Sequence, residues 1–141
     1  MKRATRTGPD DVAAMPLLAR ALALAACDPR AAAVPAGDPA TPGPYPVGIA
    51  TRYLGDVGPY YDIPVEIWYP AAAAGPADAK ASYDPLGASI PADAWRDVPP
   101  DTSAPLYLVA FSHGLGGIRQ QNFSMAERLA SYGFVVVSAD H

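Results

Sequence analysis

The 141-residue sequence has little positive charge: ten Lys and Arg stand against fourteen Asp and Glu, for a formal net charge of −4. No Lys/Arg-rich stretch follows the first six residues. Nucleic-acid binding depends on neutralising phosphates with such residues, so this composition argues against a nucleic-acid partner. No apolar run reaches the roughly 18 residues that a membrane-spanning helix needs. A single cysteine, Cys27, excludes an internal disulfide bond.

The N-terminal segment, residues 1–26, has features of an export signal. Basic residues come first, an Ala/Leu-rich segment follows, and the segment ends in Leu-Ala-Ala before Cys27. This ending resembles the bacterial lipobox, in which the signal is cut before a cysteine that carries lipid. Pro16 and Arg20 interrupt the apolar segment, however. We expect a periplasmic, cell-surface or secreted protein, with membrane attachment through lipidated Cys27 or simple secretion. The alternative is a disordered Ala-rich tail.

Residues 27–46 follow as a Pro/Ala-rich linker, because proline interrupts both helices and sheet ladders. The folded part is expected over residues 47–141. Residues 47–54 and 63–70 alternate and contain β-branched residues, which predicts two antiparallel strands. Residues 71–104 contain Ala, Pro, Asp and Gly in irregular order, which predicts a flexible surface insertion. The alternative is a flap that lines a pocket wall with its scattered apolar residues, Tyr83, Leu86, Ile90 and Trp95.

The last third of the chain predicts a strand, a crossover helix and a parallel strand. Residues 105–112 and 134–141 are continuous apolar runs of the kind found in strands buried on both faces of a sheet. Residues 118–133 have helical spacing, and Gly133 provides a left-handed end. The expected buried stripe contains Met125, Leu129 and Tyr132, and the expected outer side contains Glu127, Arg128 and Ser131. The fold class is therefore α/β, with an antiparallel hairpin followed by a βαβ unit.

A turn rich in glycine, Ser112–Gly117 (SHGLGG), follows the first of these apolar runs. Ligands of open α/β sheets bind at the carboxyl ends of the strands, where such a turn exposes backbone amides. The spacing lacks GxGxxG, and no Lys of a phosphate-binding loop follows, so nucleotide binding is rejected. Stabilisation of an oxyanion by backbone amides is the chemistry that remains.

Two histidines lie near this predicted edge of the sheet. Ser112 and His113 are neighbours on a strand, so their side chains point to opposite faces and cannot form a nucleophile–base pair. The same argument applies to Asp140 and His141. Neither histidine has the spacing of a metal site. We expect both to be structural, with His113 ordering the turn.

The run from Phe111 to His141 resembles the α/β-hydrolase family, in particular the platelet-activating-factor acetylhydrolase branch and its dienelactone-hydrolase-like bacterial relatives. These share an apolar strand, SHG-L-G, a helix, LAS-x-G, and a second apolar strand ending in (D/E)H. "YPVG" (45–48) and "VEIWYP" (65–70) are also similar to that branch. The resemblance implies that Leu115 supplies an oxyanion-hole backbone amide, that Gly114 and Gly116 let it approach the substrate, and that His113 shapes the turn. It implies a serine hydrolase of acyl esters, including lipid or phospholipid esters, with no metal or organic cofactor.

The sequence departs from the family in one respect. The family's nucleophile lies in GxSxG after the next strand, and the 141 residues contain no such motif. We therefore expect an incomplete α/β-hydrolase sheet without the catalytic triad, inactive by itself and prone to aggregate along an unpaired apolar edge. Two alternatives remain open. One is a peptidase or thioesterase of the same fold. The other is a non-enzymatic surface lipoprotein or binding module.

Overall fold

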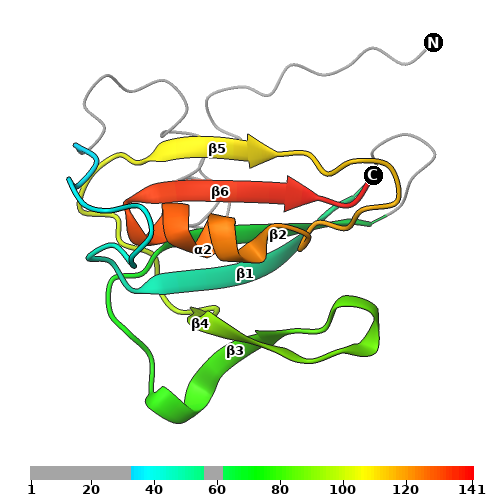
Figure 1. Ribbon diagram of the computed structural model, residues 1–141, viewed down its shortest axis with the longest axis horizontal. Helices are drawn as coiled ribbons and strands as arrows, with labels where there is room; N and C mark the ends of the chain where they lie inside the picture. The colour runs from blue at the N-terminus through cyan, green and yellow to red at the C-terminus, as the bar shows by residue number, and fades with distance from the viewer. Residues whose placement is uncertain (1–32, 56–61) are drawn as a thin grey trace.

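The computed structural model describes residues 33–55 and 62–141. The expected signal segment and Cys27 lie outside the described residues. Within them the chain forms one six-stranded mixed sheet in the order β3-β4-β1-β2-β6-β5, and helix α2 lies across one face (Figure 1). The elements in chain order are β1 Val47–Leu54, β2 Ile63–Pro70, β3 Lys80–Tyr83, β4 Ile90–Arg96, β5 Tyr107–Phe111, α2 Phe123–Ser131 and β6 Phe134–Ala139. No helix of the described residues is long and apolar enough to cross a membrane.

Strands β1 and β2 form the predicted antiparallel pair, in register from Val47–Pro70 to Leu54–Ile63. Side chains of β2 alternate between the two faces of the sheet. Trp68 belongs to a core beneath α2, whereas Ile67 and Tyr69 belong to a second core on the opposite face. Both faces of β2 therefore carry packed side chains, and both of its edges are paired, with β1 and β6.

The prediction of a flexible insertion over residues 71–104 is wrong. This segment contains β3 and β4, which pair antiparallel to each other, and β4 pairs parallel to β1. Tyr83 is fully buried, and Ala92 and Ala94 of β4 are buried with it beside Trp68. Alternating alanines give a weak hydrophobic pattern in a sequence. They are nevertheless buried here, because the bulk of Trp68 and Tyr83 fills the space above them.

The predicted βαβ unit is confirmed. Strands β5 and β6 are parallel, in register from Tyr107–Phe134 to Phe111–Ser138, and α2 lies between them in the chain. The expectation that both strands are buried holds for β6 but is wrong for β5. In the described residues β5 is the edge strand, and Tyr107 and Leu108 are exposed.

The buried stripe of the helix differs from the predicted one. Helix α2 begins at Phe123 instead of residue 118, Met125 is exposed, and Glu127 and Ser131 are buried together with two alanines. The small alanines allow the helix to approach the sheet closely, and the buried polar groups are paired, which a periodicity argument does not anticipate. Gly133 has a φ of +97°, which confirms the predicted left-handed end.

The Pro-rich residues before β1 contain neither helix nor strand in their described part, 33–46. They are nevertheless attached to the end of α2. Gly43 N–H donates to Ser131 Oγ (2.8 Å), and Tyr45 N–H donates to the Ser131 carbonyl (3.1 Å). The composition alone did not predict this attachment.

Candidate functional site

The glycine-rich turn follows β5 at the carboxyl end of the parallel strand pair. Gly116 has a φ of +74°, a conformation that side chains other than glycine rarely adopt. Gly117 N–H donates to the Gly114 carbonyl at 2.9 Å, which closes the turn. A Cβ atom at Gly117 would lie 2.9 Å from His113 Cβ, so this position also requires glycine. The glycines therefore fix a tight backbone turn.

The backbone amides of this turn are available to a ligand. Among residues 33–55 and 62–141, the N–H groups of Leu115 and Gly116 have no hydrogen-bond acceptor. The Leu115 side chain is fully exposed. A hollow of about 340 Å³ is lined by the turn itself together with Ile118 and Gln121. An oxyanion needs free N–H donors of this kind beside an open space.

His113 occupies the entrance to the turn. Its ring is nearly buried, and Nδ1 lies 3.0 Å from the Gly114 carbonyl oxygen. A carbonyl can only accept, so Nδ1 carries the proton in this contact. The ring also stacks on His141, with centroids 4.2 Å apart. This geometry is consistent with a role for His113 in shaping the turn.

Ser112 and His141 meet across the two parallel strands, with Ser112 Oγ 3.2 Å from His141 Nε2. Sequence reasoning considered only neighbours along one strand and missed this pair. Both residues follow the ends of adjacent parallel strands, which emerge at the same edge of the sheet. An activated serine also needs a group that orients its base. His141 Nδ1 instead faces the Ala139 carbonyl at 3.3 Å, and no described carboxylate bonds to it. We therefore assign no catalytic role to the pair.

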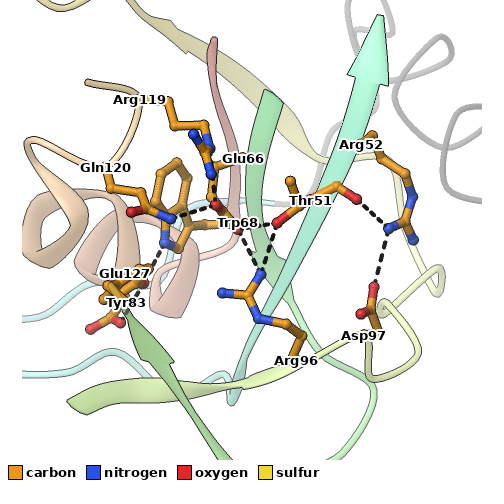
Figure 2. A network of polar contacts seen from close by, with 10 residues as sticks. All are labelled: Thr51, Arg52, Glu66, Trp68, Tyr83, Arg96, Asp97, Arg119, Gln120 and Glu127. Atoms are coloured by element: carbon orange, nitrogen blue, oxygen red, sulfur yellow. Dashed lines mark hydrogen bonds and ion pairs between the residues drawn. The ribbon is translucent and has the colours of Figure 1, made fainter. Parts of the chain in front are cut away.

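A buried carboxylate, Glu66 on β2, lies beside the exit of the turn (Figure 2). Glu66 Oε1 accepts hydrogen bonds from Arg96 Nη1 (2.7 Å) and Thr51 Oγ1 (3.0 Å). Glu66 Oε2 accepts one from Gln120 Nε2 (2.8 Å) and lies 3.4 Å from Arg119 Nε. A charge removed from water needs such partners, so the carboxylate is well compensated. The sequence signal for this site was a Glu between apolar neighbours in β2.

Arg119 connects the same exit to the end of β6. Its backbone N–H donates to Asp140 Oδ1 at 2.6 Å, and its guanidinium pairs with Asp140 Oδ2. Asp140 is therefore occupied by Arg119 and does not serve His141. Together Glu66 and Asp140 hold the residues that follow the glycine turn.

A second network of side-chain hydrogen bonds crosses the core beneath α2 (Figure 2). Trp68 Nε1 donates to Tyr83 Oη at 2.7 Å, and Tyr83 Oη donates to Glu127 Oε1 at 2.7 Å. Burial raises the pKa of Glu127 above its ordinary value. Burial, reinforced by the nearby Glu127 carboxylate, also raises the pKa of Tyr83. Glu127 lines a separate cavity of about 450 Å³ beside the Pro-rich segment.

Candidate metal ligands do not gather in the part of the chain that the structure describes. No three His, Cys, Asp or Glu side chains there are close enough to hold an ion.

Comparison with known proteins agrees with this geometry. The family model described as "Platelet-activating factor acetylhydrolase, isoform II" matches residues 87–141. The solved structure of a ferulic acid esterase from Streptomyces cinnamoneus is 28% identical, with a TM-score of 0.57 over 69% of this chain. The match covers 34% of the esterase, so this chain spans about a third of its length. A comparison with curated protein sequences found no match.

The mixed sheet, the covering helix and the glycine turn at the end of β5 match the fold of the N-terminal portion of an α/β-hydrolase. Within that superfamily, the comparisons support the platelet-activating-factor-acetylhydrolase-like branch, an esterase-like family of hydrolases.

Proposed function

We propose that this chain is the N-terminal part of a serine carboxylic-ester hydrolase and that the Leu115 backbone amide forms part of its oxyanion hole. The observation that carries the proposal is the turn Ser112–Gly117. It places an N–H group without a described acceptor at the carboxyl end of β5, beside an open hollow. The family match over residues 87–141 includes this turn.

In the proposed reaction, the Oγ of a serine attacks the ester carbonyl carbon, and the carbonyl oxygen becomes an oxyanion. The Leu115 N–H donates to that oxyanion, with Gly116 N–H as a second available donor. A general base takes the proton of the attacking serine and returns it to the alcohol oxygen as the ester C–O bond breaks. Water then hydrolyses the acyl-enzyme to release the acid and regenerate the serine. Loss of one such donor costs roughly 100- to 1,000-fold in rate.

The nucleophilic serine of this reaction lies in a GxSxG motif, and the 141 residues contain no such motif. We therefore infer that these residues alone do not hydrolyse esters and that the intact enzyme contains further sheet strands. The match to the ferulic acid esterase covers only 34% of that protein, which supports the inference.

The proposed substrate class is acyl esters, with lipid or phospholipid esters as one group and aromatic acyl esters as another. The two named relatives, an acetylhydrolase of platelet-activating factor and a ferulic acid esterase, support these groups respectively.

The test uses the intact enzyme that contains this chain, with the 141-residue chain as control. A fluorophosphonate probe is expected to label one serine of the intact enzyme and none of the control. A panel of short-chain phospholipid, feruloyl, thioester and peptide substrates then separates the esterase from the peptidase and thioesterase alternatives. An intact protein that takes no label and cleaves nothing would favour a binding module.

We also propose export, with lipid attachment at Cys27. The support is the order of basic residues, Ala/Leu-rich segment and Leu-Ala-Ala-Cys at the start of the sequence. Growth with an alkyne-tagged fatty acid is expected to label the protein. Cys27→Ala is expected to abolish that label, whereas an unlabelled but exported protein would indicate simple secretion.

A further inference from the structure

We propose that Glu66 is a positioning residue for the glycine turn and acts on it through Gln120 and Arg119. The catalytic meaning of this inference rests on the proposed function. The positional part does not, because it concerns only the order of the turn.

The Glu66 carboxylate divides its two oxygens between two parts of the molecule (Figure 2). Oε1 bonds to Thr51 of β1 and Arg96 of β4, which anchors the carboxylate in the sheet. Oε2 faces Gln120 and Arg119, which directly follow the turn. The side chain is fully buried, so no water competes for either oxygen. Glu66 thus joins the rigid middle of the sheet to the exit of the turn.

The turn itself has few anchors of its own. Three of its residues are glycines and Leu115 points into solvent, so the side-chain contacts described for it, those of Ser112 and His113, both lie at its entrance. Its internal hydrogen bond is the one from Gly117 to Gly114. The direction of the Leu115 amide therefore depends on how firmly the exit is held. An oxyanion hole depends on such preorganisation.

An isosteric substitution separates this role from general stability. In Glu66→Gln, the amide oxygen can still accept from Arg96 and Thr51. The new NH2 group then opposes Arg119 Nε, and Gln120 must turn its amide so that its oxygen accepts. The ion pair with Arg119 and the charge-assisted hydrogen bond are thereby replaced by one neutral hydrogen bond, so the link to the turn is weakened. Arg119 keeps its pair with Asp140, and Arg96 stays partly exposed to water. The sheet side of the network should therefore survive.

The first measurement is hydrogen exchange by mass spectrometry on the intact enzyme that contains this chain. Peptides covering residues 112–122 report on the hydrogen-bonded amides of Gly117, Arg119 and Gln121. Glu66→Gln is expected to speed their exchange about tenfold while peptides from β1 stay unchanged. The matched control is Glu127→Gln, which alters another buried carboxylate of the same core that has no described bond to the turn.

Two further variants keep the inference open to refutation. Gln120→Ala removes the hydrogen bond to Glu66 by a change at a half-buried residue. It therefore tests the inference even if Glu66→Gln fails to fold. The double swap Glu66→Gln with Gln120→Glu restores a charge-assisted hydrogen bond across the same gap and is expected to recover the slow exchange. Unchanged exchange in Gln120→Ala, or no recovery in the swap, would overturn the inference.

Kinetics on the same variants test the catalytic meaning. An ester substrate is expected to show kcat reduced about 10- to 100-fold with KM nearly constant, because the oxyanion amide acts in the transition state. A loosened turn in an intact protein without esterase activity would sustain the positioning role and refute the proposed function. A loosened turn with normal kcat would refute the catalytic meaning of Glu66 alone.

Discussion

The hydroxyl group of Tyr83 donates a 2.7 Å hydrogen bond to Glu127 Oε1, and this bond joins β3 to α2 across the core. The two residues are 44 positions apart. Glu127 Oε2 also lies 3.4 Å from the Asp93 N–H of β4. The segment that the sequence presents as irregular is therefore fastened to the helix by a buried carboxylate, and this fastening has consequences for stability.

The first prediction concerns pH. Burial raises the pKa of Glu127, so the folded state holds the proton more tightly than the unfolded state. The contribution of this group to the free energy of unfolding is therefore full below the unfolded pKa and is lost as pH rises through the raised folded pKa. Glu127→Gln imitates the protonated form. The unfolding free energy of the variant minus that of the wild type is expected to increase from pH 4 to pH 7 in urea titrations. A difference that is constant with pH would contradict this account.

The second prediction concerns Tyr83→Phe. The change removes the hydroxyl that accepts from Trp68 and donates to Glu127, and it leaves both buried groups with one partner fewer. Unsatisfied buried groups cost about 1–3 kcal/mol each, so we expect a loss of about 2 kcal/mol or more in chemical denaturation. Tyr53→Phe is the matched control, because Tyr53 is 65% exposed. Equal effects of the two changes would show that the hydrogen bonds of the Tyr83 hydroxyl contribute nothing to the free energy of unfolding.

The third prediction separates the backbone of Leu115 from its side chain. Leu115→Pro removes the N–H group and is expected to lower kcat for ester hydrolysis by the intact enzyme by roughly 100- to 1,000-fold. Leu115→Ala keeps the N–H group and removes an exposed side chain, so kcat is expected to stay within about threefold. Steady-state kinetics measure both variants. A Leu115→Ala variant as inactive as Leu115→Pro would assign the effect to the side chain instead.

The fourth prediction concerns the free edge of β5. Among the described residues no strand pairs with its outer side, and Leu108 on it is exposed. Exposed apolar edges pair with other chains, and lysine on an edge opposes this. We expect the 141-residue chain to aggregate and Leu108→Lys to slow the growth of light scattering several-fold. Leu54→Lys, at an exposed position on the central strand β1, is the control and should have little effect.

Local patterns in the sequence were sufficient for part of this architecture. The bounds of β1 and β2 agree with the predicted ranges, and the βαβ unit and the end at Gly133 were also predicted correctly. These features depend on neighbours along the chain: alternation, continuous apolar runs and a glycine that can adopt positive φ. The glycine turn was recognised for the same reason, since its residues are contiguous.

Other features depend on partners that are distant in the sequence. The alanines of β4 count as core only because Trp68 and Tyr83 pack over them, and Glu127 can face inward only because Tyr83 meets it there. In the sequence, Glu66 is a single charged residue in an apolar strand. Only folding brings Gln120, 54 residues later, to 2.8 Å from it. A hydrogen bond between such residues has no periodicity to reveal it. By itself the sequence determined which segments become strands and where the backbone turns. Only the tertiary structure decided which polar groups are buried together, because burying a charge is favourable only where folding brings its partners to it.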